Sequence, residues 1–312
     1  MKIAFVFPGQ GSQFVGMGKD LYDHVPSARK LFEEANEVLG YDLASICFNG
    51  PEEALKLTEN TQPALLVHST MALKILRENG IDSVLVAGHS LGEFSALVSA
   101  GALQFKDAVR LVRLRGQFMQ EAVPVGVGSM AAIIGLEIDI LQQLCDQVSE
   151  DSCMVQPANL NSPVQTVIAG HKKAVEQVSE KALKAGAKKA VPLPVSAPFH
   201  SALMKPAEIK LQKELEQTEF HDLSYPVITN IEAKPITKAS EARSALVKQV
   251  CSPVRWSETM QVLVDQGIET VIELGAGKVL SGLIKRFDRS IKCYQVGDRE
   301  SLSQTLAALN GN

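Results

Sequence analysis

The segment Ser83-Val84-Leu85-Val86-Ala87-Gly88-His89-Ser90-Leu91-Gly92-Glu93 decides the fold of this 312-residue chain. Residues 83–87 are apolar and include β-branched side chains, as in a buried parallel strand, and residues 93–100 have the composition of a helix. Strand, sharp turn and helix form the setting of a G-x-S-x-G nucleophile elbow; an ordinary glycine-flanked turn is the alternative. Gly88 and Gly92 would let the backbone pass where a Cβ atom has no room. The segment therefore predicts an α/β sheet with Ser90 exposed at the tip of a turn.

Composition narrows the class of protein. Hydrophobic residues make up 46% and charged residues 21% of the chain, which is typical of a globular protein. The net charge of −4, without a basic run, predicts no nucleic-acid partner. No apolar stretch approaches the roughly 20 residues of a membrane span, and the first apolar run is too short for a signal peptide. The five cysteines are widely spaced and form no C-x-x-C pair, so we expect free thiols, no zinc site and a cytoplasmic location.

The order of predicted elements indicates a core with an insert. The first 120 residues alternate between strand and helix, with a strand at 3–7 and helices at 26–39, 61–79 and 106–120. A Pro/Gly cluster at 123–128 marks a boundary. The next elements follow a β-α-β-β-α-β order typical of a ferredoxin-like unit: 129–134, 138–148, 154–159, 165–170, 172–185 and 189–193.

After the second boundary at Pro192-Leu193-Pro194, core elements resume at 203–215, 225–229, 257–266 and 270–274. We therefore predict an α/β protein: a parallel-sheet, hydrolase-like core with an inserted ferredoxin-like α+β subdomain. The core comprises residues 1–124 and 195–312, and the subdomain comprises residues 125–194.

A nucleophilic serine needs a base, and His200 is the candidate among six histidines. It lies in the segment 195–201, just after the predicted insert and just before a helix. Loops at the ends of elements are where catalytic groups concentrate. Position alone leaves a catalytic histidine and an ordinary loop histidine equally open.

Arg115 is unusual because helical spacing places it on the apolar face of the helix 106–120, beside Leu111 and Met119. An inward arginine requires a partner, since an unpaired buried charge is costly. The partner is either a protein carboxylate such as Glu93 or a carboxylate of the substrate. On spacing alone we favour the protein carboxylate.

Two glycine loops were tested against nucleotide motifs. Gly9-Gln10-Gly11-Ser12 lacks the third glycine of a dinucleotide fingerprint, and residues 275–278 lack the upstream glycine of a phosphate loop. The first loop directly follows the first predicted strand. It could supply a backbone N–H beside Ser90, and the N–H of Leu91 would supply the other, as in the oxyanion hole of G-x-S-x-G enzymes.

The chain resembles the malonyl-CoA:acyl carrier protein transacylases of type II fatty acid synthesis, in order and over essentially its whole length. The residues that carry this resemblance are Phe7-Pro8-Gly9-Gln10-Gly11-Ser12-Gln13, Gln62-Pro63-Ala64, Gly88-His89-Ser90-Leu91-Gly92-Glu93, Arg115-Gly116, Asn159 to Ser162, Phe199-His200-Ser201, Gln249 to Trp256 and Glu273-Leu274-Gly275-Ala276-Gly277. Ala276 stands where many relatives have proline, which affects no catalytic position.

The resemblance implies roles for eight residues. Ser90 matches the nucleophile, His200 the general base, and Arg115 the arginine that binds the malonyl carboxylate. The remaining matches are the oxyanion-hole N–H groups of Gln10 and Leu91, the histidine-orienting carbonyl of Gln249, and the site-lining Gln62 and Phe199. The match of Phe199 extends to malonyl-selective polyketide acyltransferases, and its ring should crowd an α-methyl group.

The implied reaction is ping-pong transfer of malonyl from malonyl-CoA to the phosphopantetheine thiol of acyl carrier protein, through a malonyl-serine ester. It implies no bound cofactor and no metal, and we expect a monomer. A free-standing polyketide acyltransferase is the alternative within this chemistry. A serine esterase or thioesterase would not need the inward Arg115, and an inactive carrier-protein-binding module would not need an intact Ser90 and His200.

Overall fold

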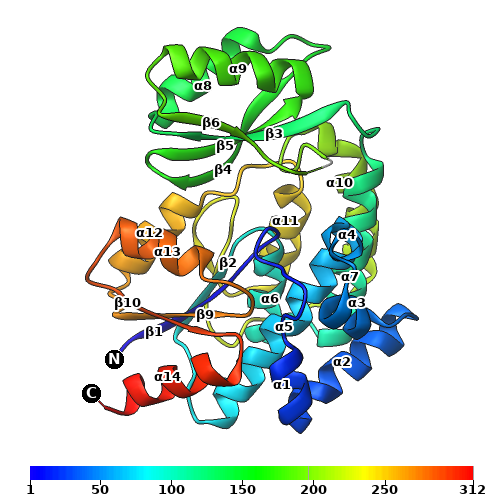
Figure 1. Cartoon of the computed structure of the whole chain (residues 1–312), viewed down its shortest axis with the longest axis vertical. Coiled ribbons are helices and arrows are strands. Elements are labelled where there is room, and N and C mark those ends of the chain that lie inside the picture. The colour runs from blue at the N-terminus through cyan, green and yellow to red at the C-terminus, as the bar shows by residue number, and fades with distance from the viewer. Residues whose placement is uncertain (196, 312) are drawn as a thin grey trace.

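The computed structural model describes residues 1–195 and 197–311 and contains two β-sheets (Figure 1). Ser196, within the segment 195–201 discussed above, and Asn312 lie outside the described residues. The larger sheet has the order β10-β9-β1-β2-β7-β8. Its strands are β1 (Ile3–Phe7), β2 (Leu85–Gly88), β7 (Val227–Ile228), β8 (Pro235–Ile236), β9 (Thr270–Leu274) and β10 (Lys292–Val296). All neighbours pair in parallel except β7 and β8. The predicted parallel-sheet core is confirmed, with one antiparallel strand added at its edge.

Both faces of this sheet are buried, because successive residues of β1 enter different cores. Phe5 and Phe7 pack in the core formed with α2 (Pro26–Leu39), α5 (Thr58–Glu78), α6 (Leu91–Ser99) and α7 (Phe105–Glu121). Ala4 and Val6 pack with α12 (Trp256–Asp265) and α13 (Val279–Phe287) on the other face. Alternation of this kind follows from the period of two along a strand. The remaining helices are α1 (Lys19–His24), α3 (Leu43–Asn49), α4 (Glu52–Lys56), η1 (Ala202–Met204), α10 (Lys205–Gln217), α11 (Ala239–Gln249) and α14 (Arg299–Asn310).

The second sheet forms the predicted ferredoxin-like subdomain, at the top of Figure 1. Its elements are β3 (Gly128–Ile134), α8 (Ile138–Val148), β4 (Val155–Ser162), β5 (Gln165–His171), α9 (Lys172–Lys184) and β6 (Lys189–Pro192). The strand order is β4-β5-β3-β6 and all neighbours are antiparallel. Both helices cover one face, with a hydrophobic core of their own. The ferredoxin-like fold is confirmed, and the boundaries at 125 and 194 stay a prediction.

Backbone hydrogen bonds join the subdomain to the core at the far end of β4. Leu160 N donates to Val254 O over 2.8 Å, and Val254 N donates to Ala158 O over 2.9 Å. Val254 belongs to the apolar core beneath β1 and β2. The subdomain is therefore tied to the apolar core that also contains Leu85 and Ala87 of β2.

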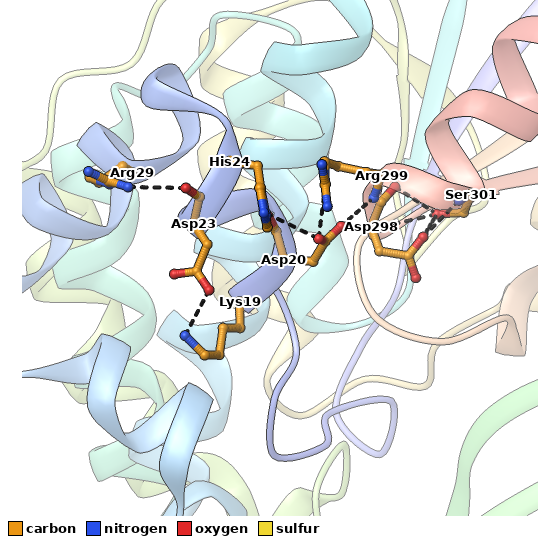
Figure 2. A network of polar contacts seen from close by, with 8 residues as sticks. All are labelled: Lys19, Asp20, Asp23, His24, Arg29, Asp298, Arg299 and Ser301. Carbon is orange, nitrogen blue, oxygen red and sulfur yellow. Dashed lines mark hydrogen bonds and ion pairs between the residues drawn. The ribbon is translucent and has the colours of Figure 1, made fainter.

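Polar contacts fasten α14 to α1 (Figure 2). Arg299 donates its backbone N–H and its Nε to the two carboxylate oxygens of Asp20, over 2.8 and 3.0 Å. Burial opposes ionisation of Asp20, but the hydrogen bonds from Arg299 outweigh it and lower the pKa of that carboxyl. Asp298 caps α14 by accepting from Ser301 N over 2.7 Å. The cap and the ion pair together fix the last helix against the first.

Several element boundaries differ from expectation. β4, predicted at 154–159, runs to Ser162, and the helix predicted at 203–215 is found as α10 at Lys205–Gln217. The strand predicted at 225–229 shortens to β7 (Val227–Ile228), because Thr229 N donates to Lys234 O and turns the chain back into β8. The helix predicted from residue 61 begins at Thr58, so Pro63 lies in its second turn. The elements that were not predicted are α1, α3, α4, β8, α11, α13, β10 and α14.

Candidate active site

The turn at Ser90 is built by three close backbone approaches. A Cβ atom on Gly88 would lie 1.9 Å from the carbonyl of Gly92, and one on Gly92 would lie 2.0 Å from Phe7 O. A Cβ atom on Gly9 would lie 2.4 Å from His89 O. Glycine is therefore required at these positions for close contact, and Ser90 itself adopts a φ of 52°. A non-glycine residue with a positive φ is strained. In a nucleophile elbow this strained conformation exposes the serine side chain at the tip of the turn.

His200 lies in hydrogen-bond contact with Ser90, although 110 positions separate them. Ser90 Oγ is 2.7 Å from His200 Nε2, and His200 Nδ1 is 2.9 Å from the backbone oxygen of Gln249. Because a carbonyl only accepts, Nδ1 carries the proton, and the lone pair of Nε2 faces the serine. Burial and the charge of Arg115 lower the pKa of His200 to about 3, so the imidazole is neutral near pH 7. The arrangement can withdraw a proton from Ser90.

Arg115 is buried, with 2% of its surface exposed. Among the described residues, its guanidinium donates hydrogen bonds only to neutral oxygens. Nη1 donates to Gln62 Oε1 over 2.8 Å, and Nη2 donates to Gln249 Oε1 over 2.9 Å and to Ser90 Oγ over 3.1 Å. Gly116 lets α7 approach this close to α5, since a Cβ there would lie 2.6 Å from Glu59 Cα.

The protein carboxylate favoured from spacing is not in contact with Arg115. The Gln249 side chain lies between Arg115 and Glu93, accepting from one and donating to the other. By contrast, Arg110 and Arg113 on the same helix pair directly with Glu214 and Glu59. Within the part of the chain that the structure describes, the expectation of a direct Glu93 pair is therefore wrong. A cation without a paired anion beside a nucleophile is suited to bind an anionic group.

Gln10 and Leu91 line the same cavity as Ser90, and each has a backbone N–H group. Gln10 N follows β1 and Leu91 N begins α6, and neither has a hydrogen-bond partner among the described residues. The N-terminus of a helix also carries a partial positive charge. These donors lie where an oxyanion formed on an attacked carbonyl could be held.

Seven of the eight residues singled out in the sequence line one cavity with an empty volume of about 540 Å³. They are Gln10, Gln62, Ser90, Leu91, Arg115, Phe199 and His200. Gln249 lies behind the cavity wall, fully buried, and contacts His200 and Arg115. The apolar part of the wall includes Met119, Met130, Leu193 and Val195, which sequence reasoning did not single out.

Comparison with known proteins gives the family. A family model described as an acyl transferase domain matches residues 4–298. A malonyl CoA-acyl carrier protein transacylase of Bacillus subtilis (strain 168) is 52% identical, over 100% of this chain and 99% of the relative. The chain belongs to the malonyl CoA-acyl carrier protein transacylase family. The resemblance stated from the sequence, and the acyltransferase class of enzyme, are thereby confirmed.

Other members of the transacylase family share both sequence and fold. The transacylase of Escherichia coli (strain K12) is 46% identical over 98% of this chain and 99% of the relative. An acyl carrier protein S-malonyltransferase from Vibrio cholerae O1 biovar eltor has a TM-score of 0.95 at 47% identity, covering 98% of this chain and 100% of that one. A malonyl-transacylase solved with its type II PKS acyl-carrier protein has a TM-score of 0.96 at 47% identity, covering 100% of both chains.

In this transacylase-family chain, a buried polar network supports the turn, and sequence reasoning missed it. Asn230 Oδ1 accepts from Ser90 N over 2.7 Å, and its Nδ2 donates to Gly88 O over 2.6 Å. Gln249 Nε2 donates to Ser90 O over 3.0 Å. These two amides bind backbone groups on both sides of the strained turn and so hold it in place. The sequence around Asn230 does not predict this role, because its partner Ser90 lies 140 positions away in the chain.

The described residues contain no group of three or more His, Cys, Asp or Glu side chains that could hold a metal ion. None of the described helices combines the length and apolarity needed to cross a membrane.

Proposed function

We propose that this chain transfers a malonyl group from malonyl-CoA to the phosphopantetheine thiol of an acyl carrier protein, through an ester on Ser90. One observation carries the proposal: the unpaired guanidinium of Arg115 lies 3.1 Å from the Ser90 hydroxyl that His200 contacts. A malonyl group has a carboxylate two bonds from the carbonyl that the serine attacks. A neutral acyl group would leave this buried cation without an anion, which disfavours an esterase or thioesterase.

In the first half-reaction, Ser90 Oγ attacks the thioester carbonyl while His200 Nε2 takes the hydroxyl proton. The N–H groups of Gln10 and Leu91 hold the resulting oxyanion. The tetrahedral intermediate collapses, the carbon–sulfur bond breaks, and His200 returns the proton to the departing CoA sulfur. Arg115 holds the malonyl carboxylate throughout, so the acyl group stays oriented.

The second half-reaction reverses the roles. The phosphopantetheine thiol gives its proton to His200 and attacks the malonyl-Ser90 ester. The same N–H groups hold the second oxyanion, and Ser90 leaves with the proton from His200. Each step uses only groups of the chain and the two substrates, so the proposal needs no metal or bound cofactor.

The proposal names acyl carrier protein as the partner and the cytoplasm as the location, with the chain acting as a monomer. The names of the relatives support the first assignment. The relative solved with a type II PKS carrier protein supports a second candidate role, in polyketide synthesis. Transfer rates to purified holo carrier proteins of the two types would distinguish these roles.

Intact-protein mass spectrometry after mixing with malonyl-CoA tests the central claim. The wild type should gain one malonyl group, which a holo carrier protein then removes. Ser90→Ala should gain none. An adduct on the alanine variant, or one mapped to another peptide, would show that Ser90 is not the nucleophile.

A further inference from the structure

A second buried ionisable group lies behind the wall of the cavity, and the transfer mechanism above does not use it. Glu93 lies three positions after the nucleophile, on the first turn of α6, and is 1% exposed. Its Oε2 accepts from Asn230 N over 3.0 Å and from Gln249 Nε2 over 2.8 Å. Gln249 Oε1 in turn accepts from Arg115 Nη2 over 2.9 Å. One amide group therefore separates a buried carboxylate from a buried guanidinium.

The chemistry of the two charged groups fixes the orientation of this amide. An ionised carboxylate only accepts hydrogen bonds, and a guanidinium only donates them. Gln249 must therefore turn its NH₂ to Glu93 and its oxygen to Arg115. The carboxylate thus fixes an acceptor against Arg115 and opposes its positive charge across the amide, while leaving N–H groups of Arg115 free for a ligand.

Resting on the proposed function, we propose that Glu93 is a positioning residue that determines how strongly the site prefers an acyl group with a carboxylate. When malonyl occupies the site, its carboxylate competes with ionised Glu93 for the single positive charge of Arg115. Binding of malonyl then favours the protonated form of Glu93, whereas binding of acetyl does not. By reciprocity, protonation of Glu93 strengthens the preference for malonyl over acetyl.

The surroundings of Glu93 place its pKa within the pH range in which acylation can be assayed. Burial raises the pKa of Glu93 to about 7, against the hydrogen bonds from Gln249 and Asn230 and the charge of Arg115. The titratable groups facing this part of the site are Arg115 from α7, His200 from the segment before η1, and His89 from the turn before α6. Burial lowers the pKa of His200 to about 3, so His200 stays neutral between about pH 6 and 8.5. Burial also lowers the pKa of His89, which favours its neutral form.

A competition experiment isolates this effect. The enzyme is mixed for a short time with malonyl-CoA and a large excess of acetyl-CoA, and the two acyl adducts are counted by intact mass. Their ratio gives relative specificity, and the ionisation of His200 and of the CoA phosphates cancels because both substrates share them. For the wild type we expect the malonyl-to-acetyl ratio to fall about three- to tenfold from pH 6 to 8.5, equivalent to a coupling of about half to one pK unit.

Glu93→Gln removes the charge, and its amide oxygen can still accept from Asn230 and Gln249. Its ratio should be independent of pH and at least as high as that of the wild type at pH 6. Glu273→Gln is the matched control: Glu273 is a buried carboxylate on β9 that accepts from Leu280 N and Ser281 N, outside the cavity. That variant should keep the wild-type slope.

The outcomes separate this inference from the proposed function. A flat ratio in the wild type, or an equal slope in Glu93→Gln, would overturn the role of Glu93 while malonylation continued. Absence of malonylation in the wild type at every pH would instead overturn the proposed function. If Glu93→Gln does not fold, the pH dependence of the malonyl-to-acetyl ratio in the wild type still tests the proposal. A Glu93 with a purely structural role would give a ratio that does not change with pH.

Discussion

Replacing Arg115 by alanine should remove malonyl transfer and leave acetyl transfer largely intact. The guanidinium has five N–H donors, of which the structure uses three, on Gln62, Gln249 and Ser90. The two N–H groups that remain for a ligand are the second one on Nη1 and the one on Nε. The buried Nε has no partner in the part of the chain that the structure describes. Arg115→Ala deletes this binding capacity together with the positive charge.

The size of the effect follows from the hydrogen bonds that a carboxylate would lose. A hydrogen bond to a charged group contributes about 1.5–3 kcal/mol, so two of them amount to about 3–6 kcal/mol. At about 1.36 kcal/mol for each factor of ten, malonyl kcat/KM should fall by about two to four orders of magnitude. Acetyl-CoA has no carboxylate, so its kcat/KM should change by less than about tenfold, a change that reflects the lost contact to Ser90 Oγ.

The assay measures the acylation rates for both CoA thioesters and the melting temperature of each variant. Arg110→Ala is the matched control, because Arg110 lies on the same helix and pairs with Glu214 at the surface. It should change neither substrate preference nor acylation rate. Parallel loss of both activities in Arg115→Ala, with a clearly lowered melting temperature, would refute the carboxylate-binding role and leave a structural one.

Further predictions concern two residues in the wall of the cavity, His200 and Phe199. His200→Ala should slow acylation by about two to four orders of magnitude, measured by quenched intact mass, and near-normal acylation would point to another base. Because the pKa of His200 is lowered to about 3, the wild-type acylation rate should not fall as the pH is lowered from about 7.5 to 5, whereas a fall near pH 6.5 would contradict a buried neutral imidazole. Phe199 is buried in the wall, so malonyl-CoA should be preferred over methylmalonyl-CoA by about 10- to 200-fold. Phe199→Ala should narrow that ratio, and equal wild-type rates for the two thioesters would show that the ring does not exclude the methyl group.

The parts of the molecule that depend on local sequence could be predicted. The strand, turn and helix around Ser90 could be predicted because glycine spacing and apolar runs are local features of the sequence. The fold of the subdomain could be predicted from the order of its elements. α14 could have been predicted in the same way but was missed. Leu302, Leu306 and Leu309 follow a helical spacing, and Asp298 precedes them as an N-cap residue.

Contacts between distant segments could not be predicted from the residues alone. Helical spacing showed that Arg115 points inward, but it could not show that a glutamine amide separates it from Glu93. The position of Asn230 depends on the pairing of β7 with β2, which places a short turn beside Ser90. Such positions are set by the packing of the whole sheet, and no local propensity encodes them.

The register of β1 has a consequence for how the protein is made. Ile3 of β1 pairs with Thr270, so one edge of this strand stays open while the residues between these two positions are synthesised. At about 5–20 residues per second on the ribosome, that wait lasts about 15–50 s. An apolar strand with an unpaired edge is a template for wrong pairing, which makes the nascent chain a natural client for chaperones. The active site also forms late. Gln249 must be synthesised before its backbone oxygen can orient His200 and its side-chain oxygen can accept from Arg115.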